Sequence, residues 1–185
     1  MKKIENFEEI KASGEFDSLK PGGYVCTLME AKDESDKEYL KVSFDVAEGE
    51  FADYYRNLYK AMNFWGGVFI RSYKEKALSM FKGFIKAVEE SNPGYVWNWD
   101  ESTLKGKKVG LILQEEEYVP TGGTHAGELR TRLIVQKVVN VETIKSGKFK
   151  VPELKKLDKY TAPTVQAQPA TPQPVNISND DLPFN

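Results

Sequence analysis

Hydrophobic and polar residues alternate along residues 39–46. Side chains of a β-strand point to opposite faces in turn, so this segment predicts a strand that is buried on one face only. The face that we expect in the core carries Leu40, Val42, Phe44 and Val46. The face that we expect to be exposed carries Tyr39, Lys41, Ser43 and Asp45.

Four further segments have the composition of strands. Residues 23–31 follow a Pro-Gly-Gly turn, and the aromatic-rich residues 53–60 predict a third strand. Residues 105–113 predict the fourth strand and residues 128–141 the fifth. Core positions expected on the fifth strand are Leu129, Leu133, Val135 and Val139. The acidic, glycine-rich residues between them, 115–128, are expected to form a long flexible loop.

The hydrophobic period changes between residues 73 and 90. Apolar side chains recur there at steps of three and four, which is typical of an amphipathic helix. The stripe consists of Ala77, Leu78, Phe81, Phe84, Ile85 and Val88. Asn92, Pro93 and Gly94 follow at once and are expected to end the helix.

The order of these elements predicts the fold class. Three strands, a helix and a final two-stranded hairpin match a mainly β, five-stranded OB-fold barrel with its helix between strands 3 and 4. An SH3-like barrel lacks that helix, and a generic α+β domain is the other alternative. We expect this domain to span residues 1–159.

The composition changes near Tyr160. Residues 161–179 hold four prolines and no charge, so they bury too little apolar surface to offset the entropy of ordering. We therefore expect residues 160–185 to be a disordered linker, which ends in the sequence SNDDLPFN. Asp180 and Asp181 account for the excess of 28 acidic over 26 basic residues, so the body is formally neutral.

Composition also bears on location. There is no long apolar run, and the lysines at positions 2 and 3 are not followed by the apolar stretch of a secretory signal. The single cysteine, Cys26, fits a reducing compartment. We expect a cytoplasmic protein without a membrane partner.

The sequence contains no recognisable set of catalytic residues. His125, the single histidine, falls in the glycine-rich loop, and Cys26 falls among apolar strand residues. The glycine pairs at 22–23 and 122–123 lack the Lys-Ser/Thr of a phosphate-binding loop. We expect no enzyme activity, cofactor or metal. An acidic two-metal nuclease remains an alternative because such sites leave weak sequence traces.

Aromatic and basic residues interleave between residues 53 and 74. Proteins that bind single strands need rings on which bases stack and cations that follow the phosphates. The candidate residues in and near this stretch are Tyr39, Lys41, Tyr55, Arg56, Tyr59, Lys60, Trp65, Arg71 and Lys74. Packing in the core is the alternative for each ring.

A second group of cations lies in residues 128–150, which hold six basic residues against two acids. Arg130 and Arg132 share a strand face beside the long loop and are candidates for phosphate contacts. The alternative is a charged strand edge that discourages edge-to-edge pairing. Of the two tryptophans at 97 and 99, one is expected to be buried and the other exposed.

Two stretches of the chain resemble a known family. The body, with GGYVCTLMEA, EYLKVSFDVAEGEF, YYRNLY and KGKKVGLIL, is similar to phage-encoded single-stranded DNA-binding proteins of Gram-positive hosts. The spacer and tip resemble bacterial single-stranded DNA-binding proteins. The matching tip residues are Asp180, Asp181, Leu182, Pro183 and Phe184.

The resemblance implies a function in DNA replication, recombination and repair. It implies a protein of the cytoplasm of a bacterial host cell that coats single-stranded DNA and recruits partner enzymes of those processes through its tip. A homo-oligomer is a further assembly that the resemblance allows. Asn185 follows Phe184, so the α-carboxylate lies one residue further along than in the bacterial tip. The competing hypothesis is a protein-interaction module without DNA binding, such as a phage recombination accessory or an inhibitor of a host factor.

Overall fold

The fold is described by a computed structural model. It describes residues 3, 5 and 18–158 of the chain. The predicted linker and tip, residues 160–185, lie outside the described residues, and so do most residues before position 18.

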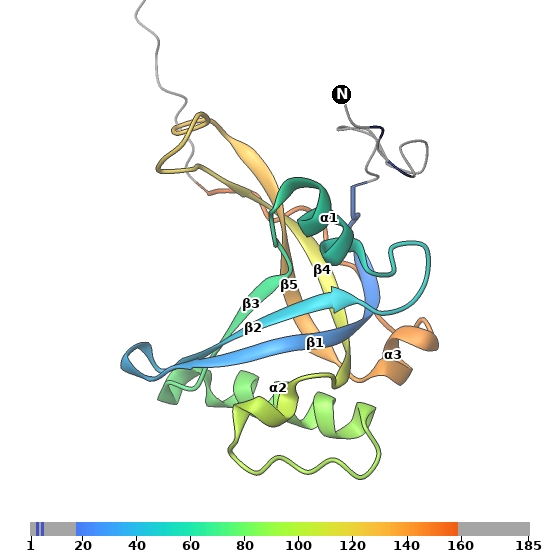
Figure 1. The fold of residues 1–185 in the computed structure, drawn as a ribbon. Helices are drawn as coiled ribbons and strands as arrows, with labels where there is room; N and C mark the ends of the chain where they lie inside the picture. The colour runs from blue at the N-terminus through green and yellow to red at the C-terminus, as the bar shows by residue number, and fades with distance from the viewer. Residues whose placement is uncertain (1–2, 4, 6–17, 159–185) are drawn as a thin grey trace, which may run out of the picture.

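A five-stranded antiparallel sheet forms the centre of the fold (Figure 1). Its order is β3-β2-β1-β4-β5. The strands are β1 (Gly22–Glu34), β2 (Tyr39–Val46), β3 (Val68–Ser72), β4 (Lys108–Tyr118) and β5 (Arg130–Val139). The predicted mainly β class and the number of strands are confirmed.

Three α-helices and three 3-10 turns complete the described chain. The helices are α1 (Tyr54–Met62), α2 (Leu78–Ser91) and α3 (Val141–Lys145). The turns are η2 (Ser35–Lys37), η3 (Glu75–Ala77) and η4 (Glu101–Leu104). The prediction of a helix between strands 3 and 4 is confirmed by α2. It begins five residues after the predicted start at residue 73, because η3 precedes it.

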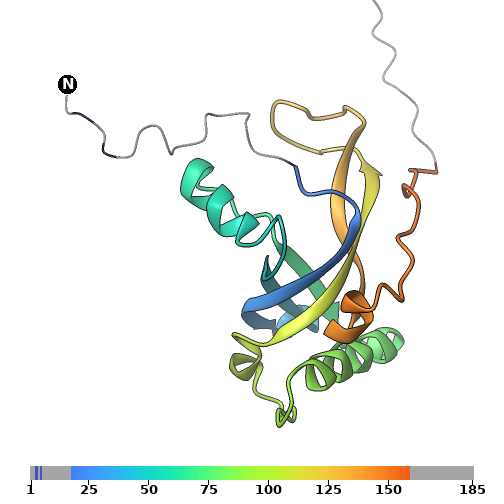
Figure 2. The ribbon, with the colours of Figure 1, turned by 90° about the vertical axis from the view of Figure 1, so that its right-hand side faces the viewer.

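The sheet is curved, but it is not closed into a barrel. Within residues 18–158, β3 pairs with β2 alone and β5 pairs with β4 alone, so the two edges do not join. α2 contacts β3, β4 and β5 and therefore covers the opening between the edges. Figures 1 and 2 show α1 and α2 at opposite ends of the curved sheet.

The predicted third strand at residues 53–60 is wrong, because this segment is helix α1. Tyr55 and Leu58 are buried at a helical step of three, whereas the aromatic content alone had favoured a strand. The third strand is Val68–Ser72. Gly67 precedes it in tight contact with β2, since a Cβ there would lie 2.3 Å from the carbonyl oxygen of Phe44.

A row of contacting aromatic rings in the core links helices α1 and α2 to the sheet. Phe44 of β2 lies 5.3 Å from Tyr55 of α1 and 5.8 Å from Phe69 of β3, between ring centroids. Phe69 in turn lies 5.8 Å from Phe84 of α2. The predicted inward face of β2 is confirmed, since Leu40, Val42, Phe44 and Val46 are all buried.

Several predicted surface and core positions differ in the structure. Leu129 precedes β5 and is exposed, and Leu78 at the start of α2 is half exposed, so neither belongs to the core. Leu133 and Val135 do pack against the core. The predicted loop is shorter than expected because residues 115–118 continue β4 opposite Arg130–Leu133.

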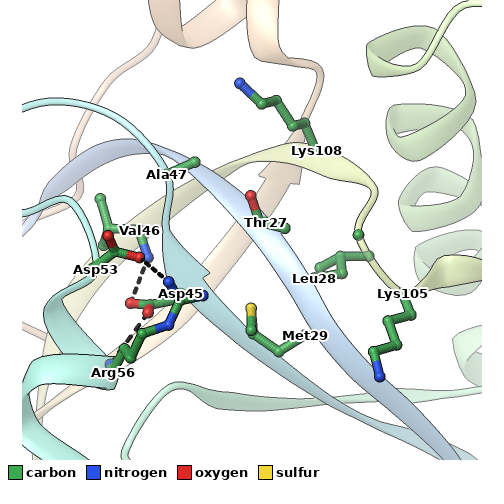
Figure 3. Close-up of a pocket in the computed structure, with 11 residues that line it drawn as sticks. Thr27, Leu28, Met29, Asp45, Val46, Ala47, Asp53, Arg56, Lys105 and Lys108 are labelled. Carbon is green, nitrogen blue, oxygen red and sulfur yellow. Dashed lines mark hydrogen bonds and ion pairs between the residues drawn. The ribbon is translucent and has the colours of Figure 1, made fainter.

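Asp45 is buried, with 2% of its surface exposed, although the alternation of β2 placed it outside. Its carboxylate accepts backbone N–H hydrogen bonds from Val46 (2.9 Å), Tyr55 (2.9 Å) and Arg56 (3.2 Å). The last two amides belong to the first turn of α1, where N–H groups lack partners within the helix. Figure 3 shows Asp45 of β2 beside Arg56 at this helix start.

We predict that Asp45→Ala lowers the free energy of unfolding by about 2 kcal/mol, because it leaves buried amides of α1 and β2 without an acceptor. Asp36→Ala in the exposed turn η2 is the matched control and is expected to change it by less than about 0.5 kcal/mol. Urea unfolding measures both values. Equal stabilities of the two variants would contradict this role of Asp45.

Candidate nucleic-acid interface

The outer face is the side of β1, β2 and β3 that lies opposite the buried Val42 and Phe44. The strand register places Lys41 opposite Ile70 and Ser43 opposite Val68. Ile70 is 52% exposed and Val68 is also exposed. An apolar strip thus runs along β3 beside a lysine of β2, and Tyr39 lies half-buried at the start of β2 on the same face.

Further cations adjoin this face near a cavity of about 280 Å³. Arg56 of α1 and Lys105, from the turn before β4, flank Met29 of β1 (Figure 3). The pairing of β1 with β2 joins this cavity to the strip of Lys41 and Ile70. Thr27, which lines the cavity, lies opposite Asp45, and Glu30, further along β1, lies opposite Ser43. The outer face therefore combines Lys41, Arg56 and Lys105 with exposed and half-buried apolar groups.

Ion pairs reduce the positive charge of several of these cations. Arg56 Nη1 lies 2.8 Å from Asp53 Oδ1, and Lys32 Nζ lies 3.4 Å from Glu34. Hydrogen bonds from Lys108 and Lys145 lower the pKa of Glu48 and keep that carboxylate charged. Lys41 and Lys105 form no ion pair within the described residues, so they are the cations of this face that are free to meet a phosphate.

Exposed rings lie on α1 and in the segment between α1 and β3. Tyr59 is 50% exposed and Phe64 is 58% exposed. The Trp65 ring lies 6.3 Å from Tyr59, and its Nε1 donates a hydrogen bond to the Gly67 carbonyl (3.1 Å). Trp65 is thus fixed in place and half-buried, whereas Tyr59 and Phe64 offer surface on which a base can stack.

Two of the predicted binding residues face the core. Tyr55 is buried, and burial raises the pKa of its hydroxyl. Arg71 lies opposite Leu40, which puts it on the inner side of the sheet. Its guanidinium lies 4.7 Å from the Phe69 ring centroid and donates to the Ile70 carbonyl, and burial lowers its pKa to about 10. The expected exposure of both residues is wrong.

Arg130 and Arg132 lie on β5, at the opposite edge of the sheet from β3. Arg132 binds the Glu116 carboxylate through Nη2 (2.6 Å) and Nε (3.0 Å) and covers the Tyr118 ring. Arg130 lies 3.6 Å from the Glu128 carboxylate. Both arginines therefore already have carboxylate partners. Lys60 on α1 and Lys74 after β3 are exposed.

A cluster of lysines was not among the predicted site residues. Lys137, Lys148 and Lys150 line a hollow of about 630 Å³ together with Phe149. They form no ion pair in the part of the chain that is described, and Phe149 packs over Gly23, where a Cβ would lie 2.3 Å from the ring. The basic excess of residues 128–150 was the signal, but it did not tell paired from unpaired cations.

The described residues contain no group of three or more His, Cys, Asp and Glu side chains suited to hold a metal ion. Every helix that the structure describes is too short or too polar to span a membrane. No known protein-family model matches the chain. No curated protein has significant sequence similarity to it.

Glu116 predicts a pH-dependent contribution to stability. Hydrogen bonds from Lys155 and Arg132 lower its pKa, so the carboxylate stabilises the fold above the ordinary glutamate pKa of about 4.3. This contribution is lost as the pH falls through the lower pKa of the folded state. We expect Glu116→Gln to cost about 1 kcal/mol at neutral pH and almost nothing in strong acid.

Urea unfolding of both proteins across this pH range measures the effect. The neighbouring Glu115→Gln is the control, since its side chain forms no ion pair within residues 18–158. A cost of Glu116→Gln that stays constant with pH would contradict the assigned charge interaction.

Proposed function

We propose that the protein is a non-catalytic binder of single-stranded DNA that coats the strand with its outer face. The observation that carries this proposal is the combination of free lysines with exposed apolar and aromatic groups on neighbouring elements. Lys41 lies beside Ile70, and Lys105 adjoins the half-buried Met29. Bases supply flat apolar surface and phosphates supply charge, so a single strand matches both components.

The fold supports the same proposal. We propose that the open sheet is a relative of the OB-fold, which is itself described as a partly open five-stranded barrel. OB-folds bind oligonucleotides over strands 2 and 3 and the loops between strands 1–2 and 4–5. The outer face includes the corresponding pair β2 and β3, and η2 occupies the loop between β1 and β2.

The near balance of charge limits how this binding works. Glu30 and Glu34 lie on the outer face among the lysines, so few phosphates are neutralised at one time. Each neutralised phosphate of a single strand contributes a salt slope of about −0.7. Contacts with the bases therefore carry a large part of the affinity, and duplex DNA, whose bases are stacked inside, binds more weakly.

The test is tryptophan fluorescence titration with a thymidine oligonucleotide of about 20 nucleotides, which exceeds the site of one OB-fold. Lys41→Glu is expected to weaken binding about tenfold and to reduce the salt slope by about 0.7. Lys82→Glu, a matched charge reversal at an exposed position of α2, is expected to change the affinity by less than about twofold and to leave the salt slope unchanged. Equal effects of the two variants, or equal affinity for duplex DNA, would overturn the proposal.

The C-terminal tip adds a second part to this proposal. By the resemblance of Asp180–Phe184 to the bacterial tip, these residues recruit replication, recombination or repair proteins. Deletion of residues 178–185 is expected to leave affinity for the oligonucleotide unchanged or slightly higher, because two negative charges are removed. It is also expected to abolish capture of such partners by the immobilised protein. Capture that persists after deletion would show that the tip is not the docking element.

An interaction module without DNA binding is the second candidate, and the edge of β3 favours it. Along residues 18–158 no strand pairs with the outer edge of β3, and this strand exposes Val68 and Ile70. An unpaired apolar edge is a template for pairing with another chain. If this candidate is correct, the wild-type protein has no affinity for the oligonucleotide. The Ile70→Lys variant then loses association with the partner protein.

A further inference from the structure

A cavity of about 290 Å³ lies apart from the outer face, at the far end of the β1–β2 hairpin. Strand alternation separates the two: Asp33 and Leu40 point into the cavity side, whereas their neighbours Lys32 and Lys41 point to the outer face. α2 contributes Leu78 and Phe81 to its wall. The segment between α2 and β4 contributes Trp97, Trp99 and Glu101.

The wall of this cavity consists mainly of aromatic rings. Tyr73 and Phe81 pack edge to face at 5.9 Å, and Trp97 and Trp99 lie 6.3 Å apart, between ring centroids. Trp99 is 82% exposed, and its φ of 66° puts it in the left-handed region that bulky residues rarely occupy. Backbone strain of this kind is concentrated at ligand-binding sites.

The charges of the cavity are all negative. Asp33 and Glu101 belong to its wall, and none of the lining residues, all of them described, is a lysine or arginine. The Tyr73 hydroxyl donates a 2.8 Å hydrogen bond to Asp33 Oδ1 and fixes that carboxylate. This bond, burial and the charges of Asp33, Glu38 and Glu101 together raise the pKa of Tyr73 to about 12.

The Trp97 side chain in this wall carries a buried polar atom without a partner among the described residues. Trp97 Nε1 is buried and has no acceptor within the described part of the chain. The backbone N–H of the same residue is satisfied by Glu89 Oε1 at 2.9 Å. A buried donor without an acceptor is costly, so the Trp97 indole is an energetically unfavourable part of this wall.

We propose that this cavity binds an organic cation, an alkylammonium or quaternary ammonium group, between its aromatic rings and the carboxylates of Asp33 and Glu101. A ring attracts a cation through its quadrupole, and aromatic cages select quaternary ammonium groups in this way. The two carboxylates add direct attraction and repel phosphate. DNA on the outer face and a cation in this cavity therefore occupy separate sites, and the inference stands without the proposed function.

The probe is choline, whose quaternary ammonium group is the kind of cation that aromatic cages bind. Binding is followed through the indole N–H signals of Trp65, Trp97 and Trp99 in NMR spectra of the full chain, assigned with Trp→Phe variants. We expect the signals of Trp97 and Trp99 to shift and that of Trp65 to stay, with dissociation in the millimolar range. 3,3-Dimethyl-1-butanol, the neutral analogue of choline, is expected to bind at least tenfold more weakly.

Variants test the residues that carry the proposal. Glu101→Gln and Trp99→Ala are each expected to weaken choline binding at least fivefold. Asp36→Asn, a matched acidic position on η2 outside the cavity, is expected to change it less than twofold. Equal affinity for the neutral analogue, or choline binding that survives Trp99→Ala unchanged, would overturn the proposal.

Two further arms distinguish the sources of the cation. Tighter binding of a free polyamine such as spermidine would indicate a small-molecule ligand. Tighter binding of a short peptide with a trimethylated or unmodified lysine would indicate the side chain of a partner protein. Saturating choline is expected to leave oligonucleotide affinity unchanged, so failure of DNA binding and failure of cation binding are separate results.

Discussion

The arrangement of the described chain depends on the Asp45 carboxylate. It joins the end of β2 to the first turn of α1 through three backbone hydrogen bonds. The negative charge also matches the partial positive charge at a helix N-terminus. Because α1 begins here, Tyr55 is held against Phe44 in the core, and Arg56 projects beside Met29 on the outer face. One buried charge thus positions a core ring and a surface cation in consecutive residues.

The second constraint on the fold is that the sheet is open, so the apolar inner side of its edge strands has to be covered by α2. A sheet with two free edges leaves the inner side of β3 and β5 uncovered, and a helix that contacts both strands replaces the missing strand pairing with apolar packing. Phe84 reaches Phe69 of β3, so the row of aromatic rings continues across the gap. The backbone edge of β3 remains available. Arg132 of β5 binds Glu116 of β4, and the segment around Lys155 pairs with β4 at this same residue.

Local periodicity was enough to predict the strand at residues 39–46 and a helix at residues 73–90, which the structure has at Leu78–Ser91, because each buries one face against the core. It failed at residues 53–60, where aromatic side chains are compatible with a strand and a helix, and where a distant carboxylate determines the result. The same limit applies to the candidate site. Lys41 lies on its predicted face, but Arg71 turns inward because the true third strand begins at Val68 and fixes a register that the sequence does not reveal. Whether a cation is free or paired, as for Lys137 and Arg132, depends on tertiary contacts between residues far apart in the chain.

The body is formally neutral, but its charges are not spread evenly over the surface. Adjacent residues of one hairpin, Lys41 and Leu40 on β2 and Lys32 and Asp33 on β1, point to opposite sides of the sheet. Lys32 and Lys41 therefore lie on the outer face together with Glu30 and Glu34, whereas Asp33 joins Glu101 at an aromatic cavity on the other side, whose described lining carries no cation. Under the two proposals, a phosphate strand is attracted to the unpaired lysines and repelled by the carboxylates of the cavity, and an organic cation is attracted to those carboxylates. The two proposals together therefore require separate sites of opposite charge on one small domain, which a surface with evenly mixed charge does not supply.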